Sequence, residues 1–560
     1  MKPRLRTFLA LLLAPLAALQ AAVKVAIPGD WRGSAGQGKV STAAGVVAVE
    51  RAAETADDFT SVAEAQALGE GFYVFSGKAR TAAAANGAAG VLARKASGEP
   101  LREWKTPRLP EAGRSDWRDF SVRLYAPGET AKFQIILSSS AGKVEFKDLQ
   151  LEKTSWLEGR GAAAPKLEFW INMDYYDNVT SSKALGLEGY GEREITAYFE
   201  TCRKKGVNGV HWRASALGQM QYPSKAATPF PGRLKMERLD PDQARFAKTI
   251  TEIDPLALAV REAKKNGIEL YIWMTLIDEG FNHPAIGDFF FSDFQLDHPH
   301  TMLLNRKGEP LKGTICYNEP EAFAYRINIV KELLSYGADG LYLCNRTHNW
   351  SFGRNDADEY GFNPAVVAEY RKRYGADILA QDFDVKKLRG IRAEAYDRLI
   401  EEVARLTHAA GQKVRLGVGN SALSGGPLGP NWGMLRVDWR RYVKEGWVDS
   451  IVSGQDKLSH YLAGAEMNQF RRVAKAGQKL YFWAEMNNWR GGGMYPPEDL
   501  LRQAEAFAFF GANGGIHHES LNLESANGTA NYFDPLTLFY RSLNSSGAAV
   551  SPTSSPPGPR

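Results

Sequence analysis

The sequence predicts a protein of several domains, in which an N-terminal all-β jelly-roll or β-sandwich is followed by a (β/α)8 barrel. Three observations lead to this prediction. The chain has 560 residues, of which 44% are hydrophobic, and a single ordinary core rarely grows to that size. Short strands separated by turn residues fill the first part of the chain. Apolar strands that alternate with amphipathic helices fill the rest.

Residues 1–22 have the pattern of a secretory signal peptide. Three basic residues precede an apolar run from Phe8 to Leu19, and small residues follow this run. The run is shorter than the roughly 20 residues of a transmembrane helix. We therefore expect cleavage, no membrane association afterwards, and a secreted or periplasmic protein. A retained membrane anchor is the alternative.

Residues 23–158 are predicted to form the β-sandwich, because their short strands are separated by Gly, Pro and Ser turns. The stretch 117–153 resembles the closing strands of jelly-roll carbohydrate-binding modules. Such modules usually stack sugars on exposed aromatic side chains. Tyr73, Phe75 and Trp104 are aromatic residues in this region that could take such a role, although packing in the core is the stronger expectation.

Residues 159–166 are rich in small side chains and are the predicted linker, and the barrel is predicted over residues 167–544. Several of its helices end in Gly close behind a basic residue, which is a common C-terminal stop. Residues 545–560 are rich in Ser, Pro and Gly and are predicted to be a disordered tail. The eight expected barrel strands are 166–174, 206–214, 268–278, 340–346, 414–420, 449–456, 480–487 and 513–520.

Composition excludes several classes of function. Lys and Arg total 69 against 64 Asp and Glu, and no long basic run occurs, so no nucleic-acid partner is expected. Three cysteines exclude a disulfide framework and allow at most one bridge. The chain has no phosphate-binding loop, dinucleotide fingerprint or G-x-S-x-G turn, so we predict no cofactor. The oligomeric state is not specified by the sequence.

The chemistry is expected at the C-terminal ends of the barrel strands, where barrel enzymes carry their active sites. Here these ends are rich in carboxylates, amides and aromatic rings. Glycoside hydrolysis requires two carboxyl groups flanking the scissile bond, while amides, Arg and His suit sugar hydroxyls. The predicted substrate-binding residues are Asp174, Tyr175, Trp212, Arg213, Asn345, Arg346, His348, Asn420, Asp456, Asn488 and Glu519.

Glu485 is the strongest catalytic candidate, because the apolar run before it places it at the tip of the seventh strand. Its expected role is nucleophile or base. The third strand lies opposite the seventh in a ring of eight, so Asp278 or Glu279 is the favoured acid on the other side of the barrel mouth.

The fourth strand ends without a carboxylate, since Cys344 and Asn345 stand where many barrel enzymes that cleave sugars place an acid. We expect Cys344 to pack as a small apolar residue. Any catalytic pair must therefore come from other strands. Asp174, Asp456 and Glu519 are rivals for the second catalytic position.

A metal-assisted hydrolase is a further alternative, because the long segment after the third strand is rich in His and Asp. In that case His283 or His298 would converge with acidic residues on one point. No spacing in this segment matches a tight metal motif, so no metal site is predicted and a sugar-binding loop is favoured.

The stretch 338–378 resembles bacterial glycosyl-hydrolase-like barrel proteins of the family-10-like group, and the resemblance extends over residues of about 166–530. It implies a secreted glycoside hydrolase acting on a polysaccharide or oligosaccharide, with an appended sugar-binding module. A non-catalytic polysaccharide-binding protein on a degenerate barrel is the alternative. The matching residues are Tyr360, Gly361, Phe362, Asn363, Pro364, Tyr370, Arg373, Tyr374, Gly375 and Asp377.

Overall fold

The structure of the protein is a computed structural model, which describes part of the chain. The described residues are 22–33, 38–51, 59–81, 86–106, 116–160, 165–174, 191–216, 218–233, 239–283, 287–345, 359–418, 437–454, 463–486, 495–518 and 533–545.

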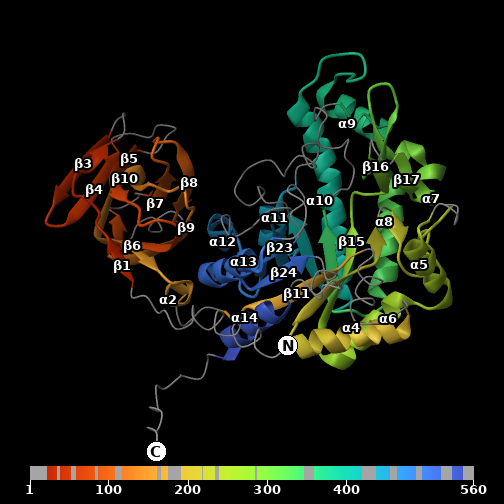
Figure 1. Ribbon diagram of the computed structural model, residues 1–560. Helices are drawn as coiled ribbons and strands as arrows, with labels where there is room; N and C mark the ends of the chain where they lie inside the picture. The colour runs from red at the N-terminus through yellow and green to blue at the C-terminus, as the bar shows by residue number, and fades with distance from the viewer. Residues whose placement is uncertain are drawn as a thin grey trace, which may run out of the picture. The chain divides into compact units, whose positions relative to one another are not determined.

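The N-terminal part is all-β, as predicted. Its ten strands belong to one connected antiparallel system (Figure 1). They are β1 (Val23–Val25), β2 (Arg32–Gly33), β3 (Gly38–Ala43), β4 (Val46–Arg51), β5 (Phe59–Gln66), β6 (Gly71–Thr81), β7 (Asn86–Arg94), β8 (Pro100–Lys105), β9 (Arg118–Ala126) and β10 (Lys132–Thr154).

The long strand β10 belongs to both sheets of this β-sandwich. Its first half, 132–139, pairs with β5 and β7, whereas 142–154 pairs with β4 and β6. The side chains between the sheets form one hydrophobic core, in which Tyr73, Phe75 and Trp104 are fully buried. These three rings therefore pack in the core, and none of them offers an exposed face for a sugar.

Eight parallel strands close a barrel, which confirms the predicted fold class. Each of the eight segments expected from the sequence overlaps one of them. In ring order they are β11 (Glu168–Met173), β12 (Gly209–Arg213), β15 (Glu269–Thr275), β20 (Gly340–Cys344), β21 (Lys413–Val418), β22 (Ser450–Ser453), β23 (Lys479–Glu485) and β24 (Gly514–His518).

Helices α4, α6, α8 and α10 lie outside the strands (Figure 1), as a parallel sheet that is buried on both faces requires. The helices are α2 (Trp156–Arg160), α4 (Glu192–Lys205), α5 (Pro241–Glu252), α6 (Pro255–Asn266), α7 (Asp293–Asp297), α8 (Pro320–Leu334), α9 (Pro364–Tyr374), α10 (Val385–Ala409), α11 (Trp439–Glu445), α12 (Ala463–Arg471), α13 (Pro497–Phe510) and α14 (Phe533–Ser545).

Short elements occupy the connections that follow β12 and β15, and most of them pair as two-stranded ribbons. They are β13 (Ser215–Ala216), β14 (Gln219–Met220), β16 (Gly280–His283), β17 (Gly287–Phe291), η2 (Pro299–Thr301), β18 (Met302–Leu304) and β19 (Pro310–Ile315).

Local sequence signals explain where these helices begin and end. Helix α5 starts at a capping box, in which the Asp240 side chain accepts from the Gln243 N–H and the Gln243 side chain binds back. Helix α6 starts at Asp254 with a proline in its first turn. It ends at Gly267, whose φ of 69° is a left-handed conformation that glycine adopts without strain.

The chain divides into two compact units. The first contains residues 1–164, 416–484 and 502–512, and the second contains 165–415, 485–501 and 513–560. Strands of the closed barrel therefore contribute to both units, so this division does not coincide with the predicted segments. The boundaries at 23–158, 159–166 and 167–544 stay predictions.

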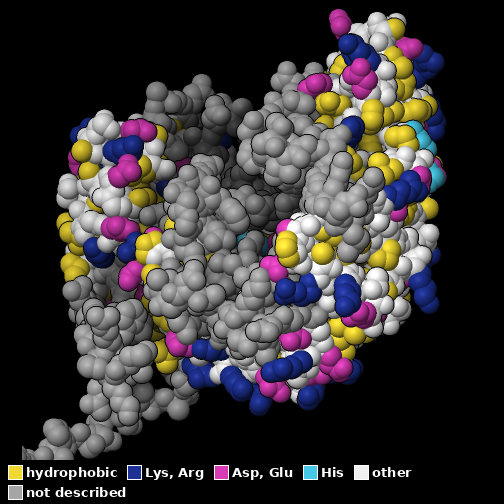
Figure 2. Space-filling model, turned by 45° about the vertical axis from the view of Figure 1, so that its right-hand side comes forward, with side chains coloured by type: hydrophobic (Ala, Val, Ile, Leu, Met, Phe, Trp, Pro, Cys, Tyr) yellow, Lys and Arg dark blue, Asp and Glu magenta, His cyan; other side chains and the backbone are white. Residues whose placement is uncertain are grey.

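On the face shown in Figure 2, the described basic side chains are interspersed with acidic ones. Within the described ranges, the helices lack the combination of length and apolar character that spanning a bilayer requires. The three cysteines are buried thiols without a disulfide, and Cys344 packs in the wall of the barrel as expected.

Candidate functional site

Side chains alternate between the inner and outer faces of each barrel strand, and strand β12 shows what this alternation does. His211 points inward and stacks on Tyr342 of β20, with ring centroids 4.1 Å apart. Trp212 points outward and stacks on Phe199 of α4 at 5.7 Å. Trp212 is buried under a helix, so the predicted sugar-binding role of this residue is wrong.

Arg213, the last residue of β12, brings together the ends of three strands. Its Nη1 donates to Asp174 Oδ1 at 2.6 Å, and its Nη2 donates to Thr275 Oγ1 at 3.1 Å. The guanidinium carbon lies 4.4 Å from the centre of the Trp273 ring. The structure thus places the predicted residues Asp174 and Arg213 together, as an ion pair. That pairing favours a structural or substrate-orienting role for Asp174 over a role as general acid.

Glu485 ends strand β23, as the sequence predicts, and its side chain has 0% relative exposure. Its Oε1 accepts from the Met486 N–H at 3.1 Å. The same N–H donates to the carbonyl oxygen of His518 at 2.9 Å. The carboxyl group is therefore held at the point where the ends of β23 and β24 meet.

Glu279 follows strand β15 and is bound to Arg326 of α8 in an ion pair whose two side chains are fully buried. The Nε of Arg326 also donates to the Tyr317 hydroxyl at 3.0 Å, and this hydroxyl donates to the Leu276 carbonyl. Burial raises the pKa of Glu279, while the charge of Arg326 opposes the rise. Glu279 therefore belongs to a cluster that ties the end of β15 to α8.

Asp278 has 1% relative exposure, and its backbone bridges to Thr314 of β19. Burial raises the pKa of Glu279 and of Tyr317, and the negative charge of Asp278 adds to both increases. Since Glu279 is bound to Arg326, Asp278 is the better candidate for an acid from this strand. In the ring order, β15 stands third and β23 seventh, so the two strand ends lie opposite each other.

Asn345 follows strand β20 and is fully buried. Its Oδ1 accepts a hydrogen bond from the Tyr396 hydroxyl of α10. The predicted amide is therefore fixed in orientation by the helical layer.

The remaining predicted substrate-binding residues cannot be placed, because they lie outside the described ranges, and their roles stay predictions. They are Tyr175, Arg346, His348, Asn420, Asp456, Asn488 and Glu519.

Two histidines after β15, His298 and His300, bind an acidic residue of helix α8. The side chain of His283 lies outside the described part of the structure. His298 Nδ1 and His300 Nε2 bind the two carboxylate oxygens of Glu321, at 2.8 and 2.9 Å. Asp297 pairs with Arg233. Among the described residues, no group of three or more His, Cys, Asp or Glu is arranged to hold a metal ion.

Two of the residues that carry the family resemblance, Gly361 and Asn363, have structural contacts near the start of helix α9. The Asn363 amide accepts from the Leu304 N–H at 3.1 Å and donates to the Met302 carbonyl at 2.7 Å, so it fastens strand β18 to the start of α9. Gly361 has a φ of 104°, and a Cβ there would lie 2.7 Å from the Arg392 side chain. These two residues therefore have a structural role in this protein.

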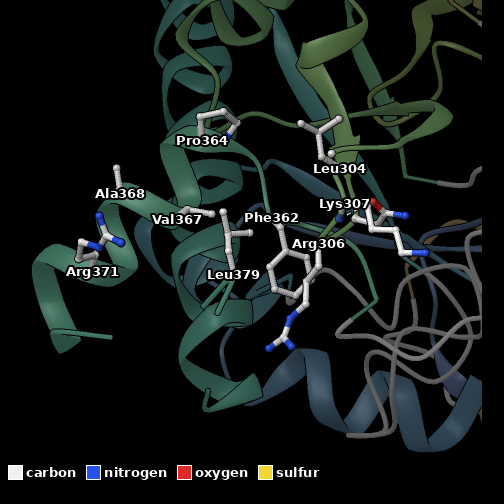
Figure 3. A pocket seen from close by; sticks show the side chains of 11 residues that line it. Leu304, Arg306, Lys307, Phe362, Pro364, Val367, Ala368, Arg371 and Leu379 are labelled. Carbon is white, nitrogen blue, oxygen red and sulfur yellow. Dashed lines mark hydrogen bonds between the residues drawn. The ribbon is translucent and has the colours of Figure 1, made fainter. Parts of the chain in front are cut away.

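A hollow of about 490 Å³ lies beside this stretch (Figure 3). Leu304, Phe362, Val367 and Leu379 form its apolar walls. Its lining does not include Glu485 or any other predicted site residue. It is therefore separate from the candidate site at the strand ends.

The sequence did not predict several inward-facing residues of the barrel strands as part of the site. These positions could have been predicted from the two-residue period of the strands, because every second residue of a barrel strand faces the interior. Polar residues at such positions are expensive to bury unless they are hydrogen-bonded. The missed residues are Asn172, His211, Trp273, Arg415 and His518.

No protein-family model and no curated protein matches this chain. Solved structures match the chain distantly. The glycoside hydrolase domain of PgaB (BpsB) from Bordetella bronchiseptica is 15% identical, with 66% of this chain and 98% of that chain covered and a TM-score of 0.43. The catalytic domain of a beta-amylase from Paenibacillus polymyxa is 10% identical, with 68% and 98% covered and a TM-score of 0.44.

A two-module structure also matches. It is the CBM22-1–GH10 portion of the endo-1,4-beta-D-xylanase 10B from Clostridium thermocellum, at 9% identity, with 93% of this chain and 98% of that chain covered and a TM-score of 0.33. All these likenesses are distant, so they carry no conclusion about the reaction. The barrel fold rests on the closed ring of eight strands.

Proposed function

We propose that this protein is a glycoside hydrolase that cleaves O-glycosidic bonds with two carboxyl groups. The observation that carries the proposal is the pair of buried carboxyl groups, Glu485 and Asp278, at the ends of two opposite strands of the barrel. Glycoside hydrolysis requires two such groups on either side of one bond. The end of the barrel to which they belong is the usual place for active sites in this fold.

In the proposed reaction, Asp278 donates a proton to the leaving glycosidic oxygen as the C–O bond breaks. Glu485 either attacks the anomeric carbon or removes a proton from the water that attacks it. The Asp174–Arg213 pair and Trp273 lie at the same end of the barrel. Charged groups suit sugar hydroxyls, and an aromatic ring suits the apolar face of a sugar ring.

The proposed substrate is a polysaccharide or an oligosaccharide that the protein meets after export. The signal-peptide pattern of residues 1–22 supports a secreted or periplasmic location. The N-terminal β-sandwich is proposed to be a carbohydrate-binding module. If it binds sugar, it uses residues other than Tyr73, Phe75 and Trp104, because the core buries all three.

The test compares the wild-type protein with Glu485→Gln and Asp278→Asn on a panel of polysaccharides and oligosaccharides. Each substitution is expected to lower kcat by about 10²–10⁴-fold, the usual contribution of a catalytic acid or base. Glu402→Gln is the matched control, because Glu402 lies on α10 in a surface ion pair with Arg405. Unchanged turnover in Glu485→Gln would remove this residue from the mechanism.

The same panel tests the alternative function. A wild-type protein that binds a polysaccharide and hydrolyses none of the panel would favour a non-catalytic binding protein on a degenerate barrel.

A further inference from the structure

We infer that His518 is a positioning residue, which a chain of hydrogen bonds across the barrel interior holds as the neutral tautomer with its hydrogen on Nε2. The chain runs from Arg415 through His211 and Asn172 to His518. The inferred role is to supply a fixed hydrogen-bond donor beside Glu485, not to transfer a proton. This role rests on the proposed function, whereas the hydrogen-bonded chain is a property of the fold.

The chain begins at Arg415 of β21, which is buried in the barrel interior. Its guanidinium carbon lies 3.9 Å from the centre of the Trp170 ring and 4.1 Å from the centre of the Tyr271 ring. Its Nη1 lies 2.9 Å from His211 Nε2. Arginine stays protonated in proteins and only donates. His211 Nε2 must therefore accept this hydrogen bond.

His211 is therefore neutral and carries its hydrogen on Nδ1. Burial lowers the pKa of His211 well below its ordinary value, and the positive charge of Arg415 adds to the decrease. The Nδ1 atom lies 2.8 Å from Asn172 Oδ1 and donates to it. The stacking on Tyr342, with an interplanar angle of 17°, limits rotation of the imidazole ring.

Asn172 links His211 to His518 on the neighbouring strand β24. Because its oxygen accepts from His211, its amide nitrogen is the atom that faces His518. Asn172 Nδ2 lies 3.4 Å from His518 Nδ1. An amide nitrogen only donates, so His518 Nδ1 accepts and the ring hydrogen resides on Nε2. Protonation of His518 would place a hydrogen on Nδ1, which would then face the hydrogen of Asn172 Nδ2. This hydrogen-bonded arrangement therefore disfavours the protonated form of His518.

The backbone of His518 lies next to the proposed catalytic residue Glu485. The carbonyl oxygen of His518 accepts from the Met486 N–H, which also contacts Glu485 Oε1 at 3.1 Å. Its ring centroid lies 6.1 Å from that of Trp273. A neutral imidazole at this position offers a donor whose state does not change over the pH range in which free histidine titrates. Such a donor orients an oxygen of the substrate or of the carboxylate without competing for the proton.

The direct test is a measurement of the tautomer in the intact wild-type protein. The protein has nine histidines, so selective ¹⁵N labelling of histidine gives a tractable long-range ¹H–¹⁵N spectrum. The signal that disappears in His518→Gln is assigned to His518. We expect the Nε2–H form to persist between about pH 5 and 8, on either side of the ordinary pKa of about 6.5. An Nδ1–H form, or titration within this range, would overturn the inference.

Asn172→Asp tests the chain itself, because this change keeps the shape and replaces the donor with an acceptor. A carboxylate at this position would accept from His518 Nδ1. We therefore expect the hydrogen to move to Nδ1, or the ring to become protonated. An unchanged His518 spectrum in a folded Asn172→Asp protein, checked by its thermal unfolding, would show that Asn172 does not set the tautomer.

Kinetics then test the role of the Nε2 donor. The amide nitrogen of glutamine replaces Nε2, and that of asparagine replaces Nδ1. His518→Gln should therefore retain more of kcat than His518→Asn, which should fall by about tenfold, the equivalent of one hydrogen bond. Equal losses in both variants would refute the donor role.

His517→Gln is the control, because His517 faces outward and binds Tyr540 of α14. The two proposals also fail separately. An Nε2–H tautomer in a protein that hydrolyses no glycoside would keep the hydrogen-bonded chain and refute both the proposed function and the role assigned to His518.

Discussion

His517 and His518 are adjacent in the sequence, yet they belong to opposite faces of the barrel wall. His517 faces the helical layer, where its Nε2 lies 2.9 Å from the Tyr540 hydroxyl and its ring packs against Phe169. Burial lowers the pKa of His517 to about 3. His518 faces the interior, where it contacts Asn172. The position of a residue along the strand thus decides whether an imidazole serves packing or belongs to the candidate site.

The same difference separates other neighbours in the sequence. In β12, Trp212 packs under α4, whereas Arg213 binds Asp174 in the interior. After β15, Glu279 is bound to Arg326 of α8, and its neighbour Asp278 is the proposed acid. These pairs indicate that changes on the outer face should lower stability, whereas changes on the inner face should lower turnover.

The ion pair on the outer face should give the largest loss of stability. Arg326→Met leaves the buried carboxylate of Glu279 without its guanidinium partner. Removal of one member of a buried pair costs about 3–5 kcal/mol, which denaturant unfolding would measure. The double variant Arg326→Met/Glu279→Gln should recover part of the loss. A single variant as stable as wild type would show that the pair is not needed to join β15 to α8.

Trp212→Ala tests the correction to the predicted site. The change removes a large buried ring between β12 and α4 and should cost about 3 kcal/mol or more. Affinity for an oligosaccharide, measured by calorimetry below the unfolding temperature, should stay the same. A selective loss of affinity with little loss of stability would restore Trp212 to the site.

The buried carboxyl group of Glu466, on helix α12, should make the stability of the protein depend on pH. It accepts from the Ser453 hydroxyl, and burial raises its pKa to about 8 from an ordinary value of 4.5. Between these two values the folded state binds more protons than the unfolded state. Its contribution to stability is therefore complete below about pH 4.5 and is lost as the pH rises through about 8.

We therefore expect this group to lower the free energy of unfolding by about 1.4 kcal/mol for each pH unit between these limits. Glu466→Gln, which stays neutral, should flatten this dependence in urea unfolding at three pH values, whereas Glu402→Gln should not. Parallel curves for wild type and Glu466→Gln would show that Glu466 is ionised in the folded protein.

Tyr540→Phe should give the smallest effect and sharpens the contrast between the two histidines. It removes one hydrogen bond to His517 on the outer face, which is worth about 1 kcal/mol. We expect a small decrease in Tm and an unchanged kcat/KM. A large decrease in kcat/KM would mean that the two faces of β24 are coupled.

The strand ends and the position of Glu485 were predictable, because short apolar segments bounded by polar residues are local signals. Contact partners were not predictable in the same way. Arg326 is 47 positions from Glu279, and Arg415 is 204 positions from His211. Periodicity shows which face of a strand a residue occupies, but it does not show which distant residue meets it there.

The sequence by itself determined the two architectures, the eight barrel strands and the acidic character of their ends, since these follow from hydrophobic periodicity and turn residues. The tertiary structure alone decided which of these residues share a site. It separated Asp278 from Glu279, turned Trp212 away from the interior and joined Arg415 to His518 through two other strands. The physical reason is that a buried polar group must find a partner, and closure of the barrel determines which partners are within reach.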